Sequence, residues 1–198
     1  PEWIERFCNE TEDTWIQSRK AWYVHAFSQN PEAKVFVTKS PPFLLNVAQL
    51  HQYFSNAKFL FMVRNPYAVV EGIYRLRSRQ RPLPGVDMLD AAANHVMTCF
   101  HYQRKNIETY HEHSTFFTYE TMCAEPERVG QAIQALVPEL DDVKLDQKIP
   151  VKGMYNEMLR DMNKEQIARL SVDDVNRINQ IFAPHQDLLD YFGYSLNE

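Results

Sequence analysis

The stretch KFLFMVRNPYAVVEGIYRLRSR, residues 58–79, has the pattern of a buried strand followed directly by a helix. Residues 59–63 form a continuous apolar run, which is typical of a strand covered on both faces, as in a parallel sheet. Arg64 follows the strand, and Pro66 stands at a position that is favoured in the first turn of a helix. The segment therefore predicts a strand-to-helix unit that delivers an arginine to the carboxyl end of a strand.

Two other segments have the pattern of strands, and helical patterns separate them. KVFVTKSPP (34–42) is rich in β-branched residues and ends in two prolines, and STFFTYETM (114–122) reads as a third strand. Apolar residues recur at helical spacing in seven segments: about 3–29, 43–54, 66–80, 88–110, 125–137, 164–170 and 173–191. Residues 141–153 look irregular. This alternation predicts a single α/β domain over residues 1–198, a parallel β-sheet flanked by helices.

Composition and charge narrow the function classes. The chain has 198 residues and a net charge of −5, which argues against a general nucleic-acid binder but leaves room for one local anion site. No apolar run approaches the ~20 residues that a membrane span needs. Three cysteines without paired spacing predict neither a disulfide framework nor a zinc site. The cysteines do not define the cellular compartment, although their pattern slightly favours a reducing one such as the cytoplasm.

The residues that follow the three predicted strands indicate where a ligand binds. In parallel sheets, ligands bind outside the carboxyl ends of the strands. Lys39 follows the first strand, Arg64 the second, and Tyr119 lies at the end of the third. The guanidinium fork suits phosphate oxygens, and free N–H groups at the helix start beside Arg64 favour an anion. Each cation alone is more often just a surface ion pair, but together they predict a phosphate clamp without defining the reaction.

Several motifs together resemble one enzyme family. KFLFMVRNPYAVVEGIYR resembles the 3′-phosphate-binding segment of sulfotransferases that use 3′-phosphoadenosine 5′-phosphosulfate (PAPS). TKSPPFLLNVAQLHQYFSNAKF resembles the lysine turn, helix and strand entry that precede it there. The family's later strand-to-helix segment resembles FTYETMCAEPERV, and its closing segment resembles LLDYFGY. The likeness covers roughly residues 34–194 and is closest to the protein-tyrosine sulfotransferases and their bacterial relatives.

The resemblance implies a fold, a reaction and a co-substrate. The fold is the P-loop-NTPase-like sulfotransferase fold, and the reaction transfers a sulfuryl group from PAPS to a hydroxyl acceptor without a metal. Peptide tyrosine, a carbohydrate and a small alcohol all remain open as acceptors. Two alternatives also stay open: a P-loop kinase-like phosphoryl transferase, which needs a Walker lysine and a Mg²⁺-holding aspartate, and a non-catalytic nucleotide-binding or interaction fragment.

The resemblance also assigns roles to individual residues. Arg64 matches the arginine that binds the 3′-phosphate, and Tyr119 is placed at the nucleotide site. Lys39 is placed near the transferring sulfuryl group and is the implied catalytic cation. Lys152 lies in a stretch that resembles the segment covering the nucleotide. Gly72 stands where the family usually has a serine that is a second ligand of the 3′-phosphate.

Two further expectations concern residues that the motifs do not supply. The family's Gly-rich phosphosulfate loop, R-S-G-T-T, is absent, and family order would place it before Pro1. We therefore expect this chain to lack the N-terminal strand and that loop, and we expect the catalytic base upstream as well. Arg104 or Lys105 is a further candidate for the nucleotide region.

Overall fold

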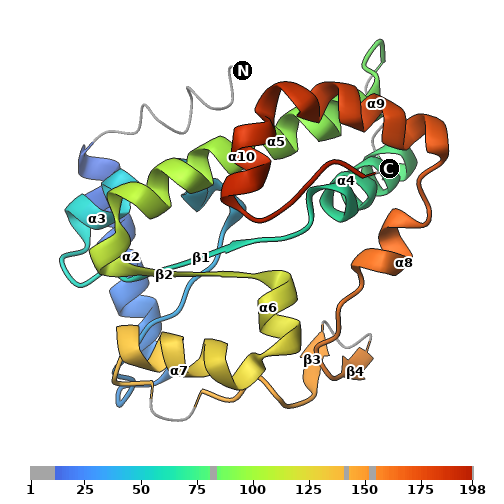
Figure 1. Cartoon of the computed structure of the whole chain (residues 1–198). Coiled ribbons are helices and arrows are strands. Elements are labelled where there is room, and N and C mark those ends of the chain that lie inside the picture. Colours follow the sequence, from blue (N-terminus) through green and yellow to red (C-terminus); the bar gives the residue numbers. More distant parts are fainter. Residues whose placement is uncertain (1–11, 81–83, 141–142, 152–154, 198) are drawn as a thin grey trace.

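The computed structural model describes residues 12–80, 84–140, 143–151 and 155–197 (Figure 1). Its α-helices are α2 (Glu12–Gln29), α3 (Val47–Tyr53), α4 (Pro66–Gln80), α5 (Met88–Thr109), α6 (Tyr119–Ala124), α7 (Pro126–Leu136), α8 (Asn163–Ile167), α9 (Val172–Phe182) and α10 (Gln186–Tyr191). Its strands are β1 (Phe59–Val63), β2 (Ser114–Thr118), β3 (Ile149–Val151) and β4 (Tyr155–Glu157). Three short 3₁₀ turns are η1 (Pro41–Leu45), η2 (His111–His113) and η3 (Ala183–His185). Within these ranges, no helix combines the length and apolarity that a membrane crossing requires.

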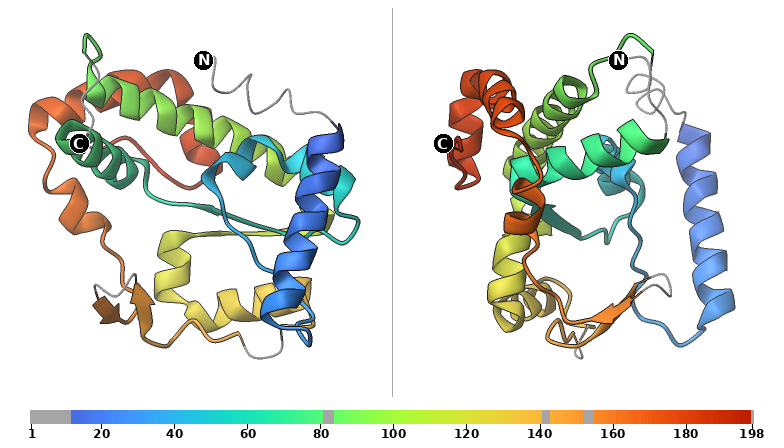
Figure 2. Two further views of the ribbon diagram at one scale, coloured as in Figure 1. Left: turned by 180° about the vertical axis from the view of Figure 1, so that it is seen from behind. Right: turned by 90° about the vertical axis from the view of Figure 1, so that its right-hand side faces the viewer.

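A two-stranded parallel sheet lies at the centre of the fold. β1 pairs with β2, so that Phe59 lies opposite Ser114 and Val63 opposite Thr118. Parallel strands need a long crossover, and α4 and α5 provide it. Helices α4, α5, α9 and α10 gather on one side of the sheet and α7 on the other (Figures 1 and 2). The predicted α/β class is confirmed.

The main core lies among α4, α5, α9 and α10. Tyr67 and Phe182 are fully buried and meet edge to face, with ring centroids 5.2 Å apart. The Tyr67 hydroxyl donates to Asn179 Oδ1 and accepts from the Asn197 backbone N–H, which fixes the C-terminal segment to this core. The strand-to-helix unit of β1 and α4 is therefore anchored by residues from the far end of the chain.

The predicted strand over residues 34–42 is wrong. The chain from residue 35 to residue 40 carries no ladder hydrogen bonds, and η1 begins at Pro41. Phe36 and Val37 are β-branched or aromatic, yet they are 46% and 71% exposed. A strand needs a partner as well as propensity, and among the described residues β1 pairs with β2 alone.

Other boundaries differ from expectation for local reasons. The predicted third strand stops at Thr118, whose side chain caps α6 by accepting from Thr121 N. The helix expected over residues 173–191 is divided by η3, because Pro184 has no N–H to continue it. Within the stretch that looked irregular, β3 forms an antiparallel pair with β4.

Phe182→Ala should destabilise the protein by about 3–5 kcal/mol, because it empties a fully buried aromatic site against Tyr67. Urea unfolding followed by circular dichroism measures the loss. Val172→Ala, on the same helix at a 78% exposed position, is the matched control and should change stability by less than about 0.5 kcal/mol. Equal effects of the two variants would mean that α9 does not pack on α4 as described.

Candidate functional site

Arg64 leaves β1 and is held on three sides. Its Nε donates to Asn163 Oδ1 at 2.7 Å, and one terminal nitrogen, NH2, donates to Gln166 Oε1. Its Cζ lies 4.3 Å from the centroid of the Tyr119 ring, which is a cation–π contact. The other terminal nitrogen, NH1, forms no hydrogen bond within the described residues. The guanidinium is therefore fixed in place with one edge available.

The Glu120 carboxylate joins four segments around Arg64. One oxygen accepts from the backbone N–H of Asn65, at 2.8 Å, and from the side-chain amide of Asn163. The other accepts from the hydroxyl of Tyr194 at 2.9 Å. Burial, and then the charge of Glu120, raise the pKa of Tyr194 above its usual value. Glu120 thus connects the β2–α6 junction to the β1–α4 junction, to α8 and to the C-terminal segment.

Asn65 explains why the chain turns from β1 straight into α4. Its side-chain oxygen accepts from the N–H groups of Tyr67 (3.0 Å) and Ala68 (3.4 Å), which satisfies donors that a helix start leaves free. The expectation that free N–H groups at this helix start would hold an anion is therefore wrong for these two groups. Side-chain donors, above all those of Arg64, remain for a ligand.

The structure brings three of the predicted residues together. Tyr119 stacks on Arg64. Gly72 adjoins the same place, because a Cβ added to Gly72 would lie 3.9 Å from Gln166 Nε2. Burial raises the pKa of Tyr119, whose hydroxyl donates to the backbone oxygen of Arg160 at 2.6 Å. Arg64, Gly72 and Tyr119 therefore form one neighbourhood.

Among the described residues, none of the other predicted cations contacts Arg64. Lys39 is exposed just before η1, and its side chain forms no hydrogen bond or ion pair within the described ranges. Lys152 falls outside the described residues. Arg104 pairs with Glu108 at 2.9 Å and with Asp187 at 3.2 Å, on the surface of α5. Lys105 is exposed on the same helix.

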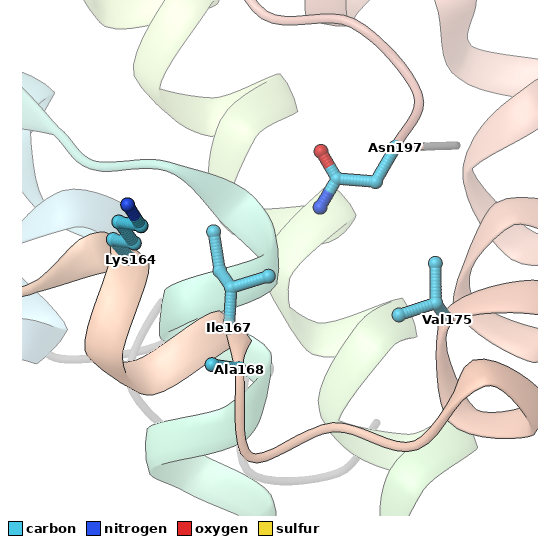
Figure 3. Close-up of a pocket in the computed structure, with 5 residues that line it drawn as sticks. All are labelled: Lys164, Ile167, Ala168, Val175 and Asn197. Carbon is cyan, nitrogen blue, oxygen red and sulfur yellow. The ribbon is translucent and has the colours of Figure 1, made fainter.

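An open hollow lies beside α8, between α8, α9 and the C-terminal segment (Figure 3). It is lined by Lys164, Ile167, Ala168, Val175 and Asn197. Its walls are mainly apolar, and the Lys164 amine and the Asn197 amide are its polar groups (Figure 3). None of these five residues is among those that contact Arg64.

Four residues of the site were not predicted from the sequence: Glu120, Asn163, Gln166 and Tyr194. The rule that selected Tyr119, its place at the end of a strand, applies equally to Glu120. Asn163 is 99 residues from Arg64 and is only 7% exposed. No local pattern in the sequence marks such a distant buried amide as a partner of Arg64.

The fold and the site define an α/β protein with an arginine held at the carboxyl ends of its parallel strands. Comparison with known proteins makes this class specific. A family model described as "Sulfotransferase family" matches residues 3–138, which is more than half of the chain. The chain belongs to the sulfotransferase family. No curated protein and no solved structure matches it. The matched region contains Arg64, Gly72 and Tyr119, whereas Asn163 and Gln166 lie beyond it.

Tyr194→Phe should destabilise the protein at neutral pH by about 1.5–3 kcal/mol, because it removes a hydrogen bond to a carboxylate. The raised pKa of Tyr194 sets the pH dependence. Near pH 10 the unfolded chain loses this proton while the folded chain keeps it, so the contribution is full below about pH 10 and falls above it. Denaturant unfolding from pH 7 to pH 11 should show the gap between wild type and variant shrinking.

Tyr23→Phe is the control for this experiment, since Tyr23 is 56% exposed on α2. It should match wild type at every pH. A gap for Tyr194→Phe that stays constant up to pH 11 would show that the hydroxyl is not held against Glu120.

Proposed function

We propose that the protein transfers a sulfuryl group from PAPS to a hydroxyl acceptor, with Arg64 holding the 3′-phosphate of the nucleotide. The supporting observation is that the guanidinium is fixed by Asn163, Gln166 and Tyr119 while its NH1 edge has no partner in the described part of the chain. The two N–H groups of NH1 remain as charged donors, and phosphate oxygens are strong acceptors for such groups. Family membership supports the same reaction class.

The charge around Arg64 supports an anionic ligand. Both side chains that accept from Arg64 are neutral amides, and no carboxylate of the described residues forms an ion pair with it. Its positive charge is therefore not neutralised at contact distance. Arg64 is also half-buried, so a ligand there would be partly shielded from water, and its attraction to the cation would be stronger than on an open surface.

Tyr119 acts as a positioning residue in this proposal. Its ring lies against the guanidinium, and its hydroxyl is fixed by the backbone oxygen of Arg160. The plane of Arg64 is thereby set before a ligand arrives. Gly72 places no side chain between α4 and Gln166, and an added Cβ would be in van der Waals contact with Gln166 Nε2.

Lys39 is the proposed catalytic cation, and Lys152 is proposed to cover the nucleotide. In the reaction, the acceptor oxygen attacks sulfur, the bond between sulfur and the bridging oxygen breaks, and adenosine 3′,5′-bisphosphate leaves. A base takes the acceptor proton. Negative charge grows on the leaving phosphate, where the Lys39 ammonium would stabilise it.

Arg64→Ala should weaken binding of adenosine 3′,5′-bisphosphate by about 30- to 150-fold, the equivalent of losing a charged hydrogen-bond pair of about 2–3 kcal/mol. Arg64→Lys should fall between wild type and Arg64→Ala, because it keeps the charge and loses the planar fork. Isothermal titration calorimetry measures all three proteins. The control is Arg128→Ala, an exposed arginine on α7, which should bind like wild type. Unchanged affinity of Arg64→Ala would refute the proposed site.

Lys39→Ala should lower turnover about 10²- to 10³-fold and change nucleotide affinity only slightly, because the cation acts on charge that develops in the transition state. The assay is radiolabelled sulfate transfer from PAPS to peptide, sugar and small-alcohol acceptors. Lys34→Ala is the control, since Lys34 is also exposed and lies in the same segment before η1. Weaker binding with normal turnover at saturation would make Lys39 a binding residue instead.

A further inference from the structure

Gln166 has an amide group of which only one end is used. Its oxygen accepts from Arg64. Every polar hydrogen of a guanidinium is a donor, so the oxygen of Gln166 is the atom that must face it. Its Nε2 then points away from that contact and lies 3.9 Å from the position of a Cβ at Gly72. Nε2 donates to no acceptor within the described residues, so Gln166 retains two N–H donors.

Asn163 provides the contrast within the same helix. Its oxygen accepts from Arg64, and its nitrogen donates to Glu120. Both ends of this amide are engaged, and its side chain is buried. Asn163 is therefore a link between Glu120 and Arg64, and it has little left to offer a ligand.

Of Arg64 and the two amides that accept from it, the atoms without a partner in the described residues are donors. They are the NH1 nitrogen of Arg64 and the Nε2 nitrogen of Gln166. The oxygens of the network already accept hydrogen bonds: both of Glu120, that of Asn163 and that of Gln166. A ligand that enters here meets a positive charge and N–H groups, which matches an anion with several acceptor oxygens.

We propose that Gln166 is a direct ligand of the phosphate bound at Arg64, donating from Nε2 across Gly72. The ligand class is a nucleotide phosphomonoester, and this assignment rests on the proposed function of Arg64. Because Gly72 has no side chain, the donor that completes the site comes from α8 and not from α4. Gln166 thus makes α8 part of the nucleotide site, although it lies outside the region that matches the family.

The position of α8 does not depend on Gln166 alone. The first residue of α8, Asn163, donates a hydrogen bond to Glu120. Arg169, just after the helix, lies 3.7 Å from the carboxylate of Glu71, a residue of α4 that is 2% exposed. A substitution at Gln166 therefore leaves α8 attached at both ends, so that a change in binding can be separated from a loss of structure.

The first test variant is Gln166→Glu in the full chain. Glutamate has nearly the same size and can still accept from Arg64, so a purely structural role of Gln166 would be kept or strengthened. The variant replaces the two spare donors by a negative charge, so a role as phosphate ligand would be lost. We expect binding of adenosine 3′,5′-bisphosphate, measured by calorimetry, to weaken by about 10-fold or more, with a melting temperature no lower than that of wild type.

Two comparison variants define the origin of the effect. Gln131→Glu adds the same charge at an exposed position of α7 and should bind within about twofold of wild type. Gln166→Met keeps the length and removes the amide without adding charge, and its affinity should lie between those of wild type and Gln166→Glu.

The outcomes separate this inference from the proposed function. If Arg64→Ala, Gln166→Glu and Gln166→Met all weaken binding while Gln131→Glu does not, the inference stands. If Gln166→Met binds like wild type, the loss in Gln166→Glu comes from its charge beside Arg64, and Gln166 is not a ligand. If Arg64→Ala weakens binding and Gln166→Glu binds like wild type, Gln166 is not a ligand, and the role of Arg64 survives. If Arg64→Ala has no effect, or wild type does not bind the nucleotide, both proposals are overturned.

Discussion

The three hydrogen bonds to the Glu120 carboxylate are the constraint on which the site depends. A half-buried carboxylate needs donors to replace the water that it loses, and Glu120 obtains them from Asn65, Asn163 and Tyr194. Each donor belongs to a different segment of the chain. The carboxylate therefore fixes the exit of β1, the start of α8 and the C-terminal segment relative to one another, and these pieces form the surroundings of Arg64.

The same carboxylate also sets the polarity of the network beyond it. An acceptor at Glu120 requires the Asn163 nitrogen to face it, so the Asn163 oxygen faces Arg64. Arg64 offers only donors, so the Gln166 oxygen faces Arg64 in turn. Acceptor and donor alternate along this chain of groups. It ends in unused N–H groups at Arg64 and Gln166. The negative charge of Glu120 therefore orients the groups so that donors face a ligand two side chains away.

The parts of the fold that could be predicted from sequence are those governed by local physics. The apolar run of β1, the proline at the start of α4 and the position of Arg64 between them are all properties of neighbouring residues. The strand predicted at Phe36 and Val37 is wrong because β-propensity says nothing about whether a partner strand is present. The roles of Asn163 and Gln166 could not be predicted for a related reason. Their contacts with Arg64 span 99 and 102 residues, and contacts at such separations produce no recognisable pattern in a single sequence.

The net charge of −5 and the proposed polyanionic ligand are compatible because they act over different distances. Exposed charges are screened beyond about 8–10 Å at physiological salt, so the overall charge affects the approach of a nucleotide more than its bound state. At contact, what counts is whether a carboxylate already neutralises the cation. Glu120 lies one amide away from Arg64, with Asn163 between them. This spacing lets the carboxylate orient the arginine through hydrogen bonds while leaving its charge for the ligand, which a direct Arg–Glu pair at the same place would not do.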